Sequence, residues 1–141
     1  MMRVQVSALI HAPRDSVSRL YADFLGWGDL FPTISAVRVV RRTGPKVVLE
    51  VDHVEGVVLN VLEYRSVGEI ELWESKRRYD ATFSNCFEIV ADGTLFTVLG
   101  NIELKGWTRF LRPFLGGYVR AQMRRYQLAP IKCAAEARFR G

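Results

Sequence analysis

His53 stands at the end of an alternating apolar stretch and is the chain's one candidate for a catalytic base. It follows Val47, Leu49 and Val51 at every second position. Because alternate residues of a strand point to the same face, His53 faces inward if these three side chains do. An inward imidazole can hold a ligand carbonyl or accept a proton. The other interpretation is a hydrogen-bonded histidine at a strand end near solvent, so we assign no catalytic residue.

Asn85 is the polar member of a strand face that is otherwise apolar or aromatic. This face comprises Tyr79, Ala81, Phe83, Asn85, Phe87 and Ile89. A buried amide has to find a hydrogen-bond partner. The alternatives are the polar head of a ligand, a core water, Tyr126 or the neighbouring strand.

Common catalytic and cofactor motifs are missing from the sequence. It has no Gly-x-Ser-x-Gly elbow, no phosphate loop, no dinucleotide fingerprint and no zinc-type histidine spacing. Carboxylates in the expected strands mostly fall on a solvated face, although the alternation leaves the direction of Glu63 and Glu74 open. The sequence therefore favours a binding protein over an enzyme and predicts no cofactor and no metal.

The composition is that of one ordinary globular domain. The chain has 141 residues, of which 49% are hydrophobic and 25% charged, so we expect a single domain over residues 1–141. No apolar run approaches the ~20 residues that span a bilayer, and we expect no signal peptide. Cys86 and Cys133 are too few for a disulfide scaffold. We expect two reduced, buried thiols in a cytoplasmic protein.

Hydrophobic periodicity predicts an α+β order of one strand, two short helices, six strands and one long helix. The first strand ends near residue 10, a helix covers 14–24 and a shorter one 27–31. Antiparallel strands follow near 34–43, 46–54, 57–65, 69–77, 79–91 and 94–104. The firmest hairpin signal is Asp92-Gly93. Such a seven-stranded sheet has one covered face, which the final helix is long enough to cover.

The closing segment combines an apolar stripe with a strongly basic remainder. Residues 107–141 carry a net charge of +7, against −2 for the rest of the chain. The stripe at helical spacing is Leu111, Leu115, Val119, Met123, Tyr126, Pro130, Cys133 and Ala137. Pro130 is expected to kink the helix near Tyr126, and Gly116-Gly117 to weaken an earlier turn. On the last strand, Gly100 indicates either a close approach of this helix or a bend.

The basic side of this helix has three interpretations. It is a solvated face, a docking surface for an anionic membrane, or, least favoured, a nucleic-acid surface. For docking to a membrane or to an acidic protein, the candidate residues are Arg120, Arg124 and Arg125.

Several motifs resemble the START-like helix-grip (SRPBCC) superfamily. They are the run 10–17 (Ile-His-Ala-Pro-Arg-Asp-Ser-Val), the run 21–24 (Tyr-Ala-Asp-Phe), the aromatic segment 27–37, and Leu128, Lys132 and Ala135-Glu136 in the closing helix. That superfamily includes the polyketide cyclase/dehydrase and lipid-transport proteins, the coenzyme Q-binding proteins and the birch-pollen-allergen-like proteins. The resemblance implies a curved sheet wrapped around the C-terminal helix, with a cavity between them.

The resemblance implies binding, and transport in some members, of a hydrophobic small molecule: a lipid, an isoprenoid quinone or a polyketide-like compound. The candidate ligand-binding residues are Trp27, Phe31, Leu49, Val51, His53, Tyr79, Phe83, Asn85, Phe87, Val98, Phe114, Tyr118, Met123 and Tyr126. One alternative is a polyketide cyclase or dehydratase with His53 as base. The other is a protein-partner module with a filled core, docking through the basic helix. A carrier of this kind would be cytoplasmic and peripheral to the membrane.

Overall fold

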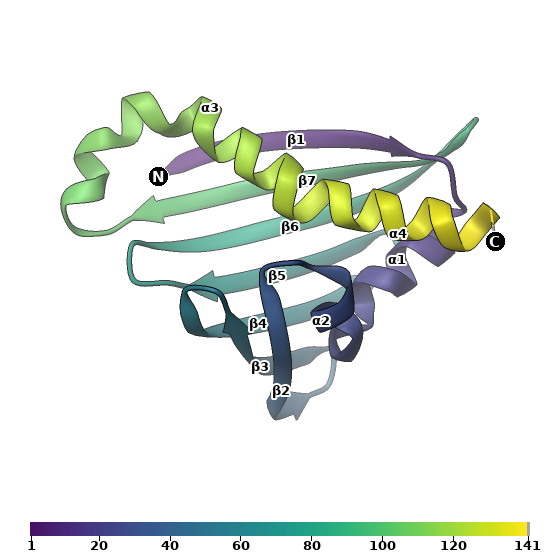
Figure 1. Cartoon of the computed structure of the whole chain (residues 1–141), viewed down its shortest axis with the longest axis horizontal. Coiled ribbons are helices and arrows are strands. Elements are labelled where there is room, and N and C mark those ends of the chain that lie inside the picture. Colours follow the sequence, from purple (N-terminus) through teal and green to yellow (C-terminus); the bar gives the residue numbers. More distant parts are fainter. Residues whose placement is uncertain (141) are drawn as a thin grey trace.

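The fold is a seven-stranded antiparallel sheet crossed by a long C-terminal helical segment (Figure 1). The computed structural model describes residues 1–140, with side chains as far as Phe139. In chain order the elements are β1 (Met2–Ile10), α1 (Arg14–Ala22), the 3-10 turn η1 (Phe24–Gly26), α2 (Trp27–Leu30), β2 (Ile34–Thr43), β3 (Lys46–His53), β4 (Gly56–Ser66), β5 (Glu69–Ser75), β6 (Tyr79–Val90), β7 (Gly93–Leu104), the 3-10 segment η2 (Gly106–Leu111), α3 (Arg112–Met123), the π-helical turn η3 (Arg124–Leu128) and α4 (Ala129–Arg140). The predicted order is confirmed, and every predicted end of the last six strands lies within two residues of the observed one.

The strands follow one another in space, except that β1 pairs with the last strand. The order across the sheet is β1-β7-β6-β5-β4-β3-β2. The register places Val6 opposite Val98 and Val98 opposite Asn85, so the inner face continues from β1 through β7 into β6. The first strand therefore closes the edge that the last hairpin would leave unpaired.

The alternation predicted along the strands is confirmed on the inner face. Val47, Leu49 and Val51 of β3 are buried, and so are Phe83 and Phe87 of β6. Ile89 was predicted on the same face, but it is exposed: the β5 pairing ends at Cys86, so Ile89 has a strand neighbour only on the β7 side. The core is therefore a single apolar layer between the sheet and the helices.

The C-terminal helix changes its buried face at the π-helical turn. Pro130 has no N–H to donate to the carbonyl of Tyr126, so the regular ladder cannot continue there. The chain takes a π turn over Arg124–Leu128 in place of the predicted kink. The predicted stripe is wrong beyond Met123, because the wider turn shifts the helical register. The buried residues are Met123, Leu128, Ile131 and Ala135, whereas Cys133 and Ala137 are exposed and Tyr126 is half-buried.

Both cysteines are exposed free thiols, which corrects the expectation that they are buried. Cys86 lies on the outer face of β6, as the strand parity predicts, but no element covers that face. Cys133 turns outward because of the register shift at the π turn. Among the described residues, no helix is long and apolar enough to cross a membrane.

The helix packs closely on the sheet at Gly100. A Cβ built on this residue would lie 3.1 Å from the Phe83 ring and 3.3 Å from the Met123 methyl carbon. The absence of a side chain on β7 therefore gives Phe83 and Met123 the room to pack together. Of the two predicted alternatives, the close approach of the helix is the one observed.

The Asp92-Gly93 turn generates a test of the fold. Gly93 has φ +143°, and a Cβ there would overlap the carbonyl oxygen of Ile10. We expect Gly93→Ala to lower the free energy of unfolding by about 3 kcal/mol or more, because backbone strain and overlap add. Gly44→Ala is the control: it also has a positive φ but open space around it, and should lose only about 1 kcal/mol. Equal losses in urea denaturation would contradict this account.

Candidate ligand-binding site

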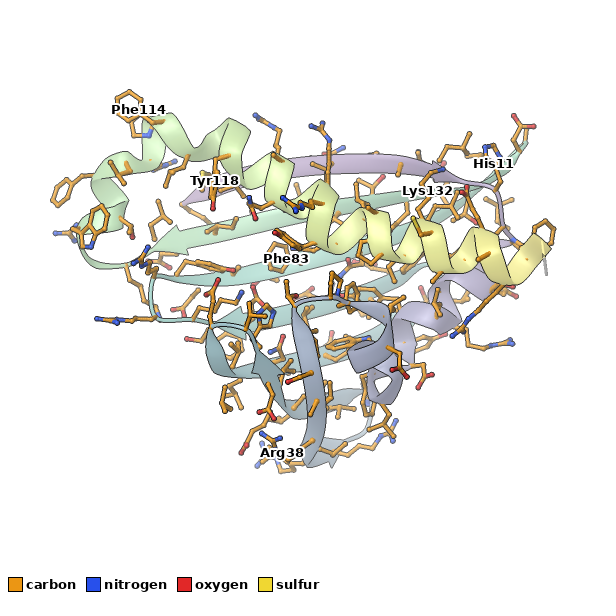
Figure 2. All side chains as sticks on the ribbon, in the orientation of Figure 1. His11, Arg38, Phe83, Phe114, Tyr118 and Lys132 are labelled. Carbon is orange, nitrogen blue, oxygen red and sulfur yellow. The ribbon has the colours of Figure 1, made fainter. Side chains whose placement is uncertain are left out.

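The structure divides the predicted ligand-binding residues into three groups by exposure. Nine are buried: Trp27, Phe31, Leu49, Val51, Phe83, Asn85, Phe87, Val98 and Met123. Three are half-buried: His53, Tyr79 and Tyr126. Phe114 and Tyr118 are exposed, and Figure 2 shows Phe114 pointing away from the sheet while Tyr118 points from α3 toward the strands. The predicted set is thus a continuous inner face with two uncovered aromatic residues at its margin.

The aromatic residues from α1 and α2 form a packed plug on the inner face. The Trp27 indole donates to the carbonyl of Tyr21 at 2.9 Å, and its ring meets Phe31 edge-on. Tyr21 also contacts Phe87 and Phe96, which stack with their centroids 4.8 Å apart. This part of the face is filled by side chains, and Trp27 and Phe31, which were predicted to bind the ligand, pack in the core there.

Asn85 is fully buried and only half satisfied. Its amide nitrogen donates to the Tyr21 hydroxyl at 3.0 Å and to the carbonyl of Ile70 on the neighbouring strand at 3.1 Å. Its carbonyl oxygen has no hydrogen-bond partner among the described residues. Burial raises the pKa of Tyr21, so its hydroxyl stays protonated. Asn85 therefore presents an acceptor oxygen to the interior.

A second polar group, here named the inner polar cluster, comprises Glu74, Lys76, Tyr79 and His53. Glu74 is buried on the inner face of β5, opposite Ala81 of β6. The Tyr79 hydroxyl donates to its Oε1 at 3.0 Å, and the Lys76 ammonium lies 3.9 Å from the same oxygen. His53 ends β3 nearby, and its Nδ1 is buried without a partner among the described residues. Four ionisable side chains thus share one region of an otherwise apolar face.

The surroundings shift the proton affinities within this cluster in opposite directions. Burial raises the pKa of Glu74, and Lys76 and the Tyr79 hydrogen bond only partly offset that effect. Burial first, and the positive charge of Lys76 second, lower the pKa of His53 to about 4. Burial and the Glu74 charge raise the pKa of Tyr79. At neutral pH His53 is neutral, and the cluster offers both hydrogen-bond donors and acceptors to a polar group placed over it.

The inner face is incompletely covered beside the cluster. Leu72 and Leu104 face inward but remain only half-buried, as do Leu115 and Val119 on the facing helix α3. Asn60 of β4, which pairs with Glu74, is buried. The uncovered region is therefore an apolar surface with a polar floor.

The structure also has two open surface hollows, and the second adjoins this region through Leu62, which pairs with Leu72. One, of about 380 Å³, is lined by Ser16, Arg19, Leu20, Asp23, Ala135, Arg138 and Phe139. The other, of about 270 Å³, is lined by Ala22, Phe24, Arg42, Gly44, Pro45, Val47, Leu62 and Tyr64. Neither includes a predicted ligand-binding residue. Among the described residues, no group of three or more His, Cys, Asp or Glu side chains is placed to hold a metal ion.

Sequence reasoning missed Lys76, Tyr21 and Asn60, and left Glu74 open. For β5 a signal existed: Ile70 and Leu72 are inward apolar residues, and Glu74 and Lys76 continue their alternation. Glu63, the other undecided carboxylate, bonds the Arg65 guanidinium at 2.8 Å on the outer face. Nothing in the local pattern marked Tyr21 as the partner of Asn85, because the two lie 64 residues apart.

The raised pKa of Glu74 generates a test by pH. A carboxyl whose pKa is raised by folding stabilises the fold at low pH, and that contribution is lost as the pH rises through the folded pKa. We therefore expect Glu74→Gln to be more resistant to urea than the wild type at neutral pH. The gain should vanish below the ordinary carboxyl pKa of 4.5. Glu71→Gln, on the outer face of the same strand beside Arg65, should bring no gain, and parallel wild-type and Glu74→Gln curves would contradict the assignment.

Solved structures share this fold over nearly the whole chain. The Zhui aromatase/cyclase from Streptomyces sp. R1128 superposes with a TM-score of 0.78 at 14% identity, covering 97% of this chain and 94% of that one. Ara h 8.0201 gives 0.73 at 18% identity, covering 98% and 97%. A START superfamily protein from Mycobacterium smegmatis gives 0.68 at 16%, also covering 98% and 97%. At these identities the likeness shows the helix-grip fold alone.

The sequence itself matches a family model over residues 1–136, described as polyketide cyclase / dehydrase and lipid transport. Comparison with curated protein sequences finds no match. The resemblance expected from the motifs in α1 and the closing helix is thereby confirmed. The match covers nearly all of the chain, and the protein belongs to the polyketide cyclase/dehydrase and lipid transport family.

Proposed function

We propose that the protein binds a hydrophobic small molecule, such as a lipid, an isoprenoid quinone or a polyketide-like compound, over the uncovered part of the inner face. The observation that carries the proposal is the combination of half-buried Leu72 and Leu104 with the inner polar cluster, of which Glu74 is buried and His53, Lys76 and Tyr79 are half-buried. An apolar surface left open to water gains about 25 cal/mol for each Å² that a ligand covers. The family, whose description names lipid transport and polyketide cyclisation, is consistent with such a ligand.

Polar groups at the floor would orient the bound molecule. The Nδ1 of His53, which has no partner among the described residues, can receive a hydrogen bond from a ligand hydroxyl. A buried polar atom without a partner is unfavourable, so satisfying it strengthens binding. Tyr118, which points toward the strands from α3, is placed to contact the apolar body of the ligand (Figure 2).

Matched substitutions on the two faces of the sheet test the location. Leu72 lies on the inner face of β5, and Leu59 lies on the outer face of β4 and is 43% exposed. We expect Leu72→Glu to weaken the binding of Nile red, a neutral apolar dye, by roughly tenfold or more, because a charge would enter the binding surface. Leu59→Glu should leave the affinity unchanged. Fluorescence titration measures the Nile red dissociation constant of each variant. Equal constants would contradict binding on the inner face.

The identity of the ligand is open to direct measurement. Native mass spectrometry of the purified protein, followed by solvent extraction, would reveal a molecule that co-purifies. A stoichiometric lipid, quinone or polyketide would establish the class of ligand.

A second candidate function is a cyclase or dehydratase acting on a polyketide-like substrate. The specific observation in its favour is the inner polar cluster, where a carboxyl with a raised pKa and a neutral histidine lie on an apolar face. Groups perturbed in this way are those that donate and accept protons at an enolisable carbon. The chemistry would need the substrate carbonyl to lie against Tyr79 or His53.

Kinetics separates the two functions. If the cluster transfers protons, we expect His53→Ala and Glu74→Gln each to lower the rate of cyclisation of a poly-β-ketone substrate by roughly 10²-fold, with little change in substrate affinity. If the protein only binds, the same variants should change the dissociation constant and show no turnover to lose. Stopped-flow absorbance together with equilibrium titration distinguishes these outcomes.

A further inference from the structure

One end of the sheet gathers three segments that are distant in the sequence. They are the β3–β4 turn, the β5–β6 turn and the start of the C-terminal helical segment. The carbonyl of Arg78 accepts hydrogen bonds from the Lys105 backbone N–H at 2.8 Å and from the Thr108 hydroxyl at 3.4 Å. Figure 1 shows α3 extending past this end of the sheet, beside the N-terminus. We refer to this end as the α3 end.

The α3 end exposes large apolar side chains. Trp107, Phe110 and Phe114 are 63%, 71% and 81% exposed, and the β3–β4 turn adds Val54 and Val57 at 75% and 65%. A single exposed apolar residue is ordinary, but several on one end of a small domain indicate an interaction surface.

The same end is basic. Arg77 and Arg78 of the β5–β6 turn and Arg109 and Arg112 of the helical segment are all exposed. Among the described residues, none of these four guanidinium groups lies within ion-pair distance of a carboxylate.

The basic groups are interleaved with the aromatic ones. The Arg78 guanidinium lies 6.0 Å from the Trp107 ring centroid, and that of Arg109 lies 5.2 Å from the Phe110 centroid. Positive charge and apolar rings therefore point outward from the same surface.

We propose that the α3 end docks on the surface of an anionic phospholipid bilayer. Aromatic rings are favourable at the level of the lipid headgroups, and arginines there pair with lipid phosphates and with the negative surface potential. An anionic membrane is favoured over a neutral one, because each basic residue near an anionic surface raises the binding constant about fivefold.

The location links docking to the proposed ligand site. Lys76 belongs to the β5–β6 turn at this end, and Tyr79 of the inner polar cluster pairs with Leu104, just before η2. A lipid leaving the bilayer at the α3 end would meet the uncovered inner face at once. Ligand transfer rests on the proposed function, whereas docking does not require it.

Vesicle sedimentation tests the proposal with no added ligand. We expect the wild type to sediment with phosphatidylcholine vesicles that contain phosphatidylserine, weakly or not at all with pure phosphatidylcholine, and less as the salt concentration rises. The variants Phe110→Ser/Phe114→Ser and Arg109→Glu/Arg112→Glu should each lower the partition coefficient roughly tenfold or more. All four side chains are exposed, and Arg109→Glu alone separates the loss of charge from the loss of the hydrogen bond that Arg112 donates to the Met1 carbonyl oxygen.

Two matched variants control for a general loss of charge or apolar surface. Phe139→Ser removes an exposed ring (61%) from the far end of α4. Arg124→Glu/Arg125→Glu reverses two charges at the π turn, where the sequence pattern predicted a docking surface. Both should bind vesicles like the wild type. Loss of binding in the Arg124/Arg125 variant alone, or no preference for anionic vesicles, would overturn the proposal.

Sedimentation velocity without vesicles tests the other occupants of this surface. A wild type that self-associates and binds no vesicles, with a monomeric Phe110→Ser/Phe114→Ser variant, would assign the α3 end to a second copy of the chain and overturn membrane docking. Failure to bind any vesicle by a monomeric protein would overturn it as well. The Nile red titration remains independent, so loss of docking with intact dye binding would leave the proposed function standing.

Discussion

Shielding the inner face of the curved sheet from water is the constraint on which the rest of the molecule depends. Its outer face is solvated, so the helices have to cover the inner one from a single side. The plug from α1 and α2 covers one region, and the C-terminal helix covers another through Met123, Leu128, Ile131 and Ala135. Gly100 lets this helix approach β7 closely enough to pack Met123 on Phe83. This contact keeps Phe83 and Met123 buried beneath the helix.

The helices cover the inner face incompletely, and the inner polar cluster lies beside the uncovered part. Leu72 and Leu104 are only half-buried, while Glu74, next along β5, is buried with Tyr79 and Lys76 as partners. A buried carboxylate is unfavourable unless it is neutralised or paired. Here the pairing is partial, which accounts for the raised pKa of Glu74. The buried carboxyl lowers the stability of the fold. It also gives the apolar surface a polar floor, and such a combination is typical of small-molecule binding sites.

The family relationship and the fold agree with one another but do not select one chemistry. A helix-grip scaffold is shared by an aromatase/cyclase and by a START superfamily protein at comparable TM-scores. The differences among such proteins have to lie in the side chains that the scaffold presents. In this chain the scaffold presents the inner polar cluster and the basic, aromatic α3 end, which adjoin through Tyr79 and Leu104.

The sequence by itself determined the elements, their order and most strand faces, because these depend on local patterns. Period-two alternation placed Leu49, Phe83 and Phe87 inward, and the Asp92-Gly93 pair marked a hairpin whose glycine has φ +143°. It also predicted burial for Asn85, since a single polar residue in an apolar face follows its neighbours.

Tertiary structure decided what depends on contacts between distant residues. Asn85 donates to the neighbouring strand, one of the predicted alternatives, and also to Tyr21, which comes from a helix 64 residues earlier. Glu74 continues the alternation of Ile70 and Leu72, and the pairing of β5 with β4 and β6 fixes the face to which all three point. The π turn before Pro130 moved Cys133 outward and brought Leu128 inward, because the helix had to keep its apolar side on the sheet after losing a hydrogen-bond donor. The aromatic rings of the α3 end stay exposed because the sheet does not extend beneath them. Only the assembled fold defines where the sheet ends relative to α3.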